Sequence, residues 1–106
     1  MFTHLKTLTT LNLSRNKIEQ IEDGAFIGLD GLSELILWSN SLTAVNEQTF
    51  SGLTSIRDIQ LFSNNITNLS PQIFENLVSL EALDIRDNPS SKNISQSDFL
   101  FENEIL

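Results

Sequence analysis

Residues 32–55 read LSELILWSNSLTAVNEQTFSGLTS, and the pattern of apolar residues around the asparagine of this stretch returns every 24 residues along the chain. The asparagines that mark the period are Asn16, Asn40, Asn64 and Asn88. Self-similarity at a fixed period of this length indicates a solenoid, in which each unit buries its apolar face against the next one. The sequence therefore predicts one core that is shared by copies of a single unit.

Apolar residues recur at three positions before each asparagine and at four positions after each of the first three asparagines. The columns before it are Leu8, Leu32, Ile56 and Leu80; Leu11, Leu35, Ile59 and Leu83; and Leu13, Leu37, Leu61 and Ile85. The columns after it are Ile18, Leu42 and Ile66; Ile21, Val45 and Leu69; Phe26, Phe50 and Phe74; and Leu29, Leu53 and Leu77. The alternation before the asparagine has the period of a short strand with its leucines turned inward. Four parallel strands are expected, around residues 10–14, 34–38, 58–62 and 82–86.

The unit can be written LxxLxLxxNxIxxIxxxxFxxLxx, and it resembles the typical leucine-rich repeat of many animal extracellular proteins, including Slit-like and Toll-like families. The resemblance covers residues 1 to about 89, without the cysteine caps of such proteins. It implies an α/β leucine-rich-repeat solenoid, a curved right-handed coil with strands on the concave face and turns and short helical or 3₁₀ segments on the convex face. The expected divisions are a partial repeat at 1–7, repeats at 8–31, 32–55 and 56–79, the start of a fourth repeat at 80–89, and an irregular tail or lid at 90–106.

The four recurring asparagines are interpreted as a structural ladder. Each one stands where the strand must bend out of the sheet, and its amide can satisfy backbone groups of the turn and of the neighbouring repeat. On the convex side, the phenylalanine column is expected to stack as a buried spine. Ser70-Pro71 has the form of a helix N-cap followed by proline, with Glu22 and Asn46 at the equivalent positions. Residue types that tolerate positive φ recur at one further position, which is occupied by His4, Gly28, Gly52 and Asn76.

Strand residues between the inward leucines are free to vary, and they suggest a binding surface on the concave face. Trp38 and Phe62 occupy one position in adjacent repeats, so their rings should meet face to edge, with Arg86 able to lie over Phe62. The predicted partner-binding residues are Glu34, Ile36, Trp38, Asp58, Phe62, Asp84 and Arg86, with Asp87 also on the acidic rim. Aromatic residues with a charged rim are typical of protein-binding hot spots. The alternative is that the aromatic pair only stabilises the sheet.

Composition excludes several classes of function. The chain has 106 residues and a formal net charge of −8, with no cluster of Lys and Arg, so nucleic acid and anionic membranes are poor partners. There is no apolar run long enough for a membrane span or a signal peptide, and no cysteine. The lone His4 is interpreted as a turn residue rather than a general base. No catalytic constellation, cofactor site or metal site is predicted, since the carboxylates of an open sheet should stay solvated rather than hold calcium.

Four sequons occur, at Asn12, Asn65, Asn68 and Asn93, and they matter only in a secreted chain. Asn65 and Asn93 are the expected glycosylation sites, because Pro71 weakens the sequon of Asn68 and a glycan on Asn12 would lie on the concave sheet.

The apolar residues of the first repeat, Phe2, Leu5, Leu8, Leu11 and Leu13, have no repeat before them in this chain and could mediate self-association. The function we expect is a protein-protein interaction module that binds a partner through its concave face. Its extracellular or cell-surface context, as part of a receptor, adhesion or matrix protein, is implied by the resemblance alone. The alternatives are a structural spacer or self-associating repeat array, and an intracellular or bacterial repeat scaffold.

Overall fold

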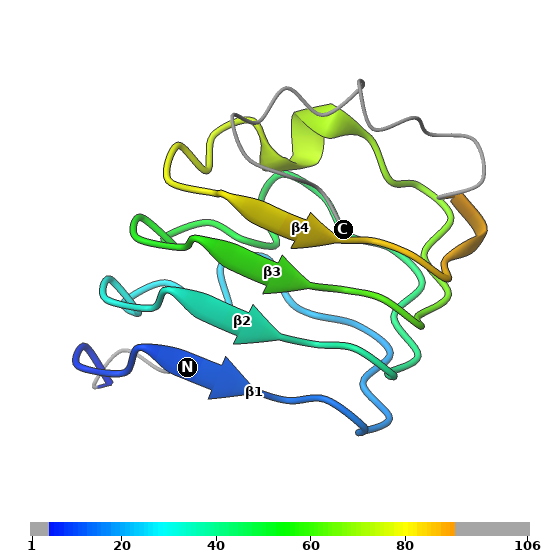
Figure 1. Ribbon diagram of the computed structural model, residues 1–106, viewed down its shortest axis with the longest axis horizontal. Coiled ribbons are helices and arrows are strands. Elements are labelled where there is room, and N and C mark those ends of the chain that lie inside the picture. Colours follow the sequence, from blue (N-terminus) through cyan, green and yellow to red (C-terminus); the bar gives the residue numbers. More distant parts are fainter. Residues whose placement is uncertain (1–4, 91–106) are drawn as a thin grey trace.

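The computed structural model describes residues 5–90, which form a single parallel sheet backed by irregular return segments (Figure 1). The strands are β1 (Thr10–Asn12), β2 (Glu34–Ile36), β3 (Asp58–Gln60) and β4 (Ala82–Asp84), and they are paired in the order β1-β2-β3-β4. The central residues Leu11, Leu35, Ile59 and Leu83 lie opposite one another. The predicted leucine-rich-repeat solenoid is therefore confirmed.

The strands are shorter than the sequence pattern suggested, since each one ends two residues before the expected position. The reason is a left-handed residue that turns the chain just before each asparagine: Arg15, Ser39, Ser63 and Asp87 have φ of 58°, 54°, 56° and 57°. Hydrogen bonding between repeats nevertheless continues past the strands, because Leu37 N donates to Gln60 O at 2.9 Å and Ser39 N donates to Phe62 O at 3.1 Å. These four residues are turn residues, so Asp87, which was expected on the acidic rim of the concave face, lies in the turn after β4.

The core lies between the sheet and the return segments. Leu35, Leu37, Ile59, Leu61 and Leu83 are fully buried in it. The phenylalanine column is buried as expected, and the rings of Phe50 and Phe74 stack with centroids 5.6 Å apart. In contrast, Leu5, Leu8, Leu11, Leu13, Ile18 and Ile21 of the first repeat are only partly buried. The packing is therefore complete in the middle repeats and incomplete at the β1 end.

The convex side differs from one repeat to the next. The third repeat carries the 3₁₀ helix η1 (Pro71–Phe74), whereas the segments equivalent to it in the two preceding repeats form turns. Ser70 precedes η1 as expected, but its side chain makes no capping hydrogen bond. The Asn46 side chain does cap its turn, because its Oδ1 accepts a hydrogen bond from Gln48 N at 2.6 Å.

Among the described residues that were predicted to adopt positive φ, only the glycines do so. Gly28 and Gly52 have φ of 102° and 92°. Asn76 does not adopt positive φ, because η1 gives the third return segment a different path, with Glu75 in the right-handed region after it. His4 lies outside the described residues.

Candidate functional site

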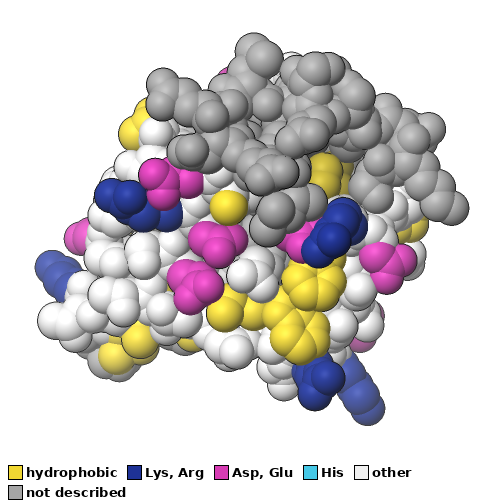
Figure 2. Space-filling model, viewed as in Figure 1, with side chains coloured by type: hydrophobic (Ala, Val, Ile, Leu, Met, Phe, Trp, Pro, Cys, Tyr) yellow, Lys and Arg dark blue, Asp and Glu magenta, His cyan; other side chains and the backbone are white. Residues whose placement is uncertain are grey.

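Side chains of the strands and of the residues that follow them gather on one open face, which we call the concave site: Glu34, Ile36, Trp38, Asp58, Phe62, Asp84 and Arg86. Figure 2 shows this face with a hydrophobic patch that has basic side chains at both ends and acidic side chains beside it. Ile36, Trp38 and Phe62 are partly buried rather than fully exposed. The site therefore offers a shaped, rigid surface and not an enclosed pocket.

Trp38 and Phe62 form the centre of the hydrophobic patch. Their ring centroids lie 5.4 Å apart, and the ring planes meet at only 11°. The rings are thus stacked, and the expected face-to-edge contact is wrong. The residues that follow the two rings, Ser39 and Ser63, have nearly equal φ of 54° and 56°.

Two arginines extend this pair into a four-member stack. The guanidinium carbon of Arg15 lies 5.3 Å from the centroid of the Trp38 ring, and that of Arg86 lies 5.9 Å from the centroid of Phe62. Arg15 belongs to the repeat before Trp38, and Arg86 belongs to the repeat after Phe62. A guanidinium group therefore lies over the ring at each end of the stack, in a cation-π contact. Sequence reasoning missed Arg15, although it follows directly the residue that aligns with Trp38.

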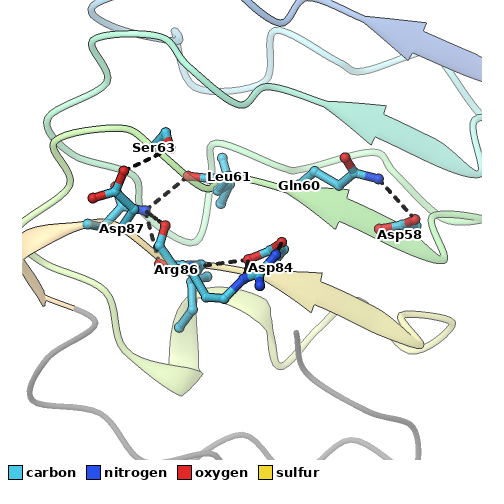
Figure 3. A network of polar contacts seen from close by, with 9 residues as sticks. Asp58, Gln60, Leu61, Ser63, Asp84, Arg86 and Asp87 are labelled. Carbon is cyan, nitrogen blue, oxygen red and sulfur yellow. Dashed lines mark hydrogen bonds and ion pairs between the residues drawn. The ribbon is translucent and has the colours of Figure 1, made fainter.

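Arg86 is held in place by Asp84 (Figure 3). Its Nε donates to Oδ1 at 2.9 Å and its terminal nitrogen donates to Oδ2 at 2.6 Å, while Arg86 N also donates to Oδ1 at 3.2 Å. Asp84 is only 3% exposed, so the expectation of a solvated rim carboxylate is wrong for this residue. Three N–H groups replace water around the carboxylate, and this contact raises the pKa of the Arg86 guanidinium.

Glu34 and Asp58 form a second acidic feature, at the beginning of β2 and β3. The two residues lie directly opposite each other in the parallel register. Their neighbours are neutral: Thr10 Oγ1 donates to Glu34 at 3.4 Å, and Gln60 Nε2 donates to Asp58 at 3.4 Å. Burial raises the pKa of the Asp58 carboxyl, and the charges of Glu34 and Asp84 raise it further, against the opposing effect of the Gln60 hydrogen bond.

The asparagine ladder runs along the edge of the sheet beside the concave site. Asn64 Nδ2 donates to Leu61 O and to Leu37 O of the preceding repeat, both at 3.0 Å, and its Oδ1 accepts from Leu42 N at 3.1 Å. Asn40 and Asn88 make the equivalent bonds. Asn16 is exposed and donates only to Leu13 O and Ser14 O of its own repeat. The ladder thus joins each repeat to the one before it.

The sequons differ in how far their side chains are engaged. Asn68 binds the backbone of Val45 through both atoms of its amide, with Nδ2 to Val45 O at 2.6 Å and Val45 N to Oδ1 at 3.3 Å. Asn12 Oδ1 accepts from both the backbone N and the hydroxyl of Ser14. Asn65 is exposed, and only its backbone N–H is engaged, in a bond to Leu42 O at 2.9 Å. Asn93 lies outside the described residues, and glycosylation of Asn65 stays a prediction.

No group of three or more metal-ligating side chains occurs within residues 5–90. In the same part of the chain, no helix is long and apolar enough to cross a membrane.

Comparison with known proteins decides the family. The model of the leucine-rich-repeat family matches residues 1–37 and 30–89. The chain belongs to the leucine-rich-repeat family. Leucine-rich repeats are generally protein-interaction modules.

Two solved leucine-rich-repeat structures are similar to the chain. In the crystal structure of a TLR13–ssRNA13 complex, the matching chain has 38% sequence identity and a TM-score of 0.76, over 82% of this chain and 12% of that one. The leucine-rich-repeat domain of APL1B has 26% identity and a TM-score of 0.73, over 82% of this chain and 26% of that domain. No curated protein matches significantly. The chain therefore spans a small part of the solved proteins that it resembles.

Proposed function

We propose that the leucine-rich-repeat chain binds a protein partner through its concave site, with Trp38 and Phe62 as the central anchor. The observation that supports this most is the four-member stack of Arg15, Trp38, Phe62 and Arg86, which lies outside the repeated core. The leucine and asparagine positions maintain the solenoid without these side chains. Aromatic residues and arginine at the centre of an open face are the residue types that dominate protein-protein hot spots.

The context we propose is a longer extracellular receptor, adhesion or matrix protein. The small share of the similar solved chains that is matched supports a longer parent protein. A standard interface also needs roughly 800 Å² on each partner, which four short strands barely provide. Additional repeats would enlarge the same concave face.

Single-stranded RNA is the competing class of ligand, because one similar structure is a TLR13–ssRNA13 complex. The charge of this chain opposes such a ligand. Its formal net charge is −8, and Glu34 and Asp58 lie on the same face as the aromatic stack, where they would repel a phosphate backbone. A protein partner is therefore the ligand class that we favour.

The test compares two double variants of the chain. A partner is first captured from the extracellular fraction of the source organism, and its dissociation constant for each variant is then measured. Trp38→Ala with Phe62→Ala should weaken binding about thirtyfold or more, because central aromatics often contribute 2 kcal/mol or more. Gln48→Ala with Gln72→Ala, on the convex side, should leave the affinity unchanged.

The same variants distinguish a binding module from a structural spacer. In a spacer, loss of the aromatic pair changes stability by up to about 1 kcal/mol and alters no association. If the convex pair abolishes binding and the concave pair does not, the recognition surface has been assigned to the wrong face.

A self-associating array is the second candidate, and it is favoured by a hollow of about 270 Å³ at the β1 end. Leu13, Ile18, Ile21, Phe26 and Leu37 are among the residues that line it. If another copy fills this hollow, light scattering should show a mass that rises with concentration, and Ile18→Asp, which changes a residue that lines the hollow, should abolish the rise. A monomer at every concentration would exclude this candidate.

A further inference from the structure

We propose that Glu34 and Asp58 form a subsite for a cationic side chain, Lys or Arg, of the protein that binds the aromatic stack. The inference rests on the proposed function and defines the chemistry of the partner. Glu34 and Asp58 stand four residues before Trp38 and Phe62 in their repeats, which is roughly 13 Å of extended chain. The partner should therefore present a basic residue at about that distance from an apolar anchor.

The carboxylates of Glu34 and Asp58 have no counter-ion among the described residues. They are direct cross-strand neighbours, and like charges at such positions destabilise a sheet. The ion pairs within residues 5–90 join Arg57 to Glu81 at 3.4 Å and Arg86 to Asp84 at 2.6 Å. Arg57 and Arg86 thus pair with other carboxylates, and the charge of the Glu34–Asp58 pair is left for a ligand to neutralise.

The pKa of the Asp58 carboxyl is consistent with this assignment. Burial, Glu34 and Asp84 all raise the pKa of its carboxyl, and only the Gln60 amide opposes them. A cation placed between Glu34 and Asp58 would relieve this unfavourable charge, since an opposite charge within about 4–6 Å favours the ionised form. Binding of a basic side chain should therefore depend on both carboxylates.

The aromatic stack determines what can bind beside the acidic pair. One face of Trp38 is covered by Phe62 and the other by Arg15, while Arg86 covers the outer face of Phe62. A nucleobase would need an open ring face on which to stack, as in single-strand binding proteins. The ring edges remain for contact, and they suit an aliphatic side chain or the methylene stem of Lys or Arg.

The probes are peptides that are selected from a displayed random library for binding to the wild-type chain. Trp38 is the single tryptophan of the sequence, so peptides that change its fluorescence are those that occupy the concave site. Their dissociation constants are measured on Glu34→Gln with Asp58→Asn, on Trp38→Ala with Phe62→Ala, and on the charge-matched convex control Glu22→Gln with Glu47→Gln. Matching thermal melts establish that each variant is folded.

We expect the retained peptides to contain Lys or Arg and to lose tenfold or more in affinity on Glu34→Gln with Asp58→Asn. Replacing the basic residue of the peptide by Gln should cause the same loss on the wild-type chain and no further loss on this variant. The convex control should change affinity less than twofold.

Three outcomes overturn the proposal. If peptides lose affinity on the aromatic variant but not on Glu34→Gln with Asp58→Asn, the cation subsite is wrong and the proposed function stands. If no selected peptide changes Trp38 fluorescence, or neither concave variant weakens binding, both the cation subsite and the proposed function are wrong. If single-stranded polyuridylate binds the wild-type chain and the aromatic variant abolishes that binding, the ligand class is wrong.

Discussion

The first and third repeats carry the same residue types at the core and ladder positions, yet these residues have different surroundings. Leu61 is fully buried, whereas Leu13 at the equivalent position is only partly buried. Asn64 bonds to two repeats, whereas Asn16 bonds only to its own. A repeat position therefore has no fixed energetic value, because its contribution depends on the neighbour against which it packs.

Leucine truncation should show the largest difference between the two repeats. Leu61→Ala removes fully buried methyl groups and should lower the free energy of unfolding by about 2–5 kcal/mol. Leu13→Ala should cost no more than about half as much, since part of that side chain already contacts water. Chemical denaturation measures both values. Equal losses would mean that the first repeat is as well packed as the third.

Replacing the ladder asparagines should give the next largest difference. Asn64→Leu leaves Leu42 N without its side-chain acceptor and removes one of the two asparagine donors of Leu37 O and of Leu61 O, so it should cost about 1–3 kcal/mol. Asn16→Leu should stay within about 0.5 kcal/mol, because Asn16 is exposed and makes no bond to another repeat. Thermal melting provides the comparison. Unchanged melting of Asn64→Leu would refute the ladder interpretation.

The convex side allows a backbone comparison between the second and third repeats. Gly52 has φ of 92°, and a Cβ added there would lie 2.8 Å from the Cα of Ile27. Gly52→Ala should therefore destabilise the chain by about 1–3 kcal/mol. Asn76→Ala should change stability by less than about 0.5 kcal/mol, since Asn76 is exposed and lacks positive φ. A comparable loss at both positions would contradict the different paths of the two return segments.

The smallest expected effect concerns pH and Asp58. The folded-state pKa of Asp58 is raised above its ordinary value of 3.8, so protonation of Asp58 stabilises the folded chain. This stabilisation is fully present below pH 3.8 and is lost as the pH rises through the folded-state pKa. Asp58→Asn should therefore be more stable than the wild-type chain at neutral pH, by up to about 1 kcal/mol after allowance for solvent screening. This advantage should disappear in acid. Denaturation at several pH values tests the sign, with Glu47→Gln as the convex control; a destabilised Asp58→Asn variant at neutral pH would contradict it.

The fold was predictable because leucines and asparagines at a fixed spacing leave few ways to bury one face. The left-handed turn before each asparagine was not predictable from residue types. Arg15, Ser39, Ser63 and Asp87 share no composition that requires positive φ, and their conformation is imposed by the hydrogen bonds around them. The ends of the strands were misplaced for this reason.

Sequence periodicity predicted that Trp38, Phe62 and Arg86 lie together, but it predicted neither the contact of Arg15 with Trp38 nor the geometry of the side chains. Trp38 and Phe62 stand out because folding does not require them, but the stacked angle between their rings depends on backbone conformation. The burial of Asp84 depends on where Arg86 lies, which strand periodicity does not specify. The partner of the site stays a proposal, because no residue pattern names a ligand.

The asparagine ladder has a consequence for the order in which the chain folds. Its bonds between repeats join residues that are 22 or 27 positions apart, and this separation is the same at Asn40, Asn64 and Asn88. Each added repeat therefore closes a loop of nearly constant length, at nearly constant entropic cost. Folding can begin at the best-packed repeats and spread in both directions, and the smallest register error that preserves the ladder is a shift by one whole repeat.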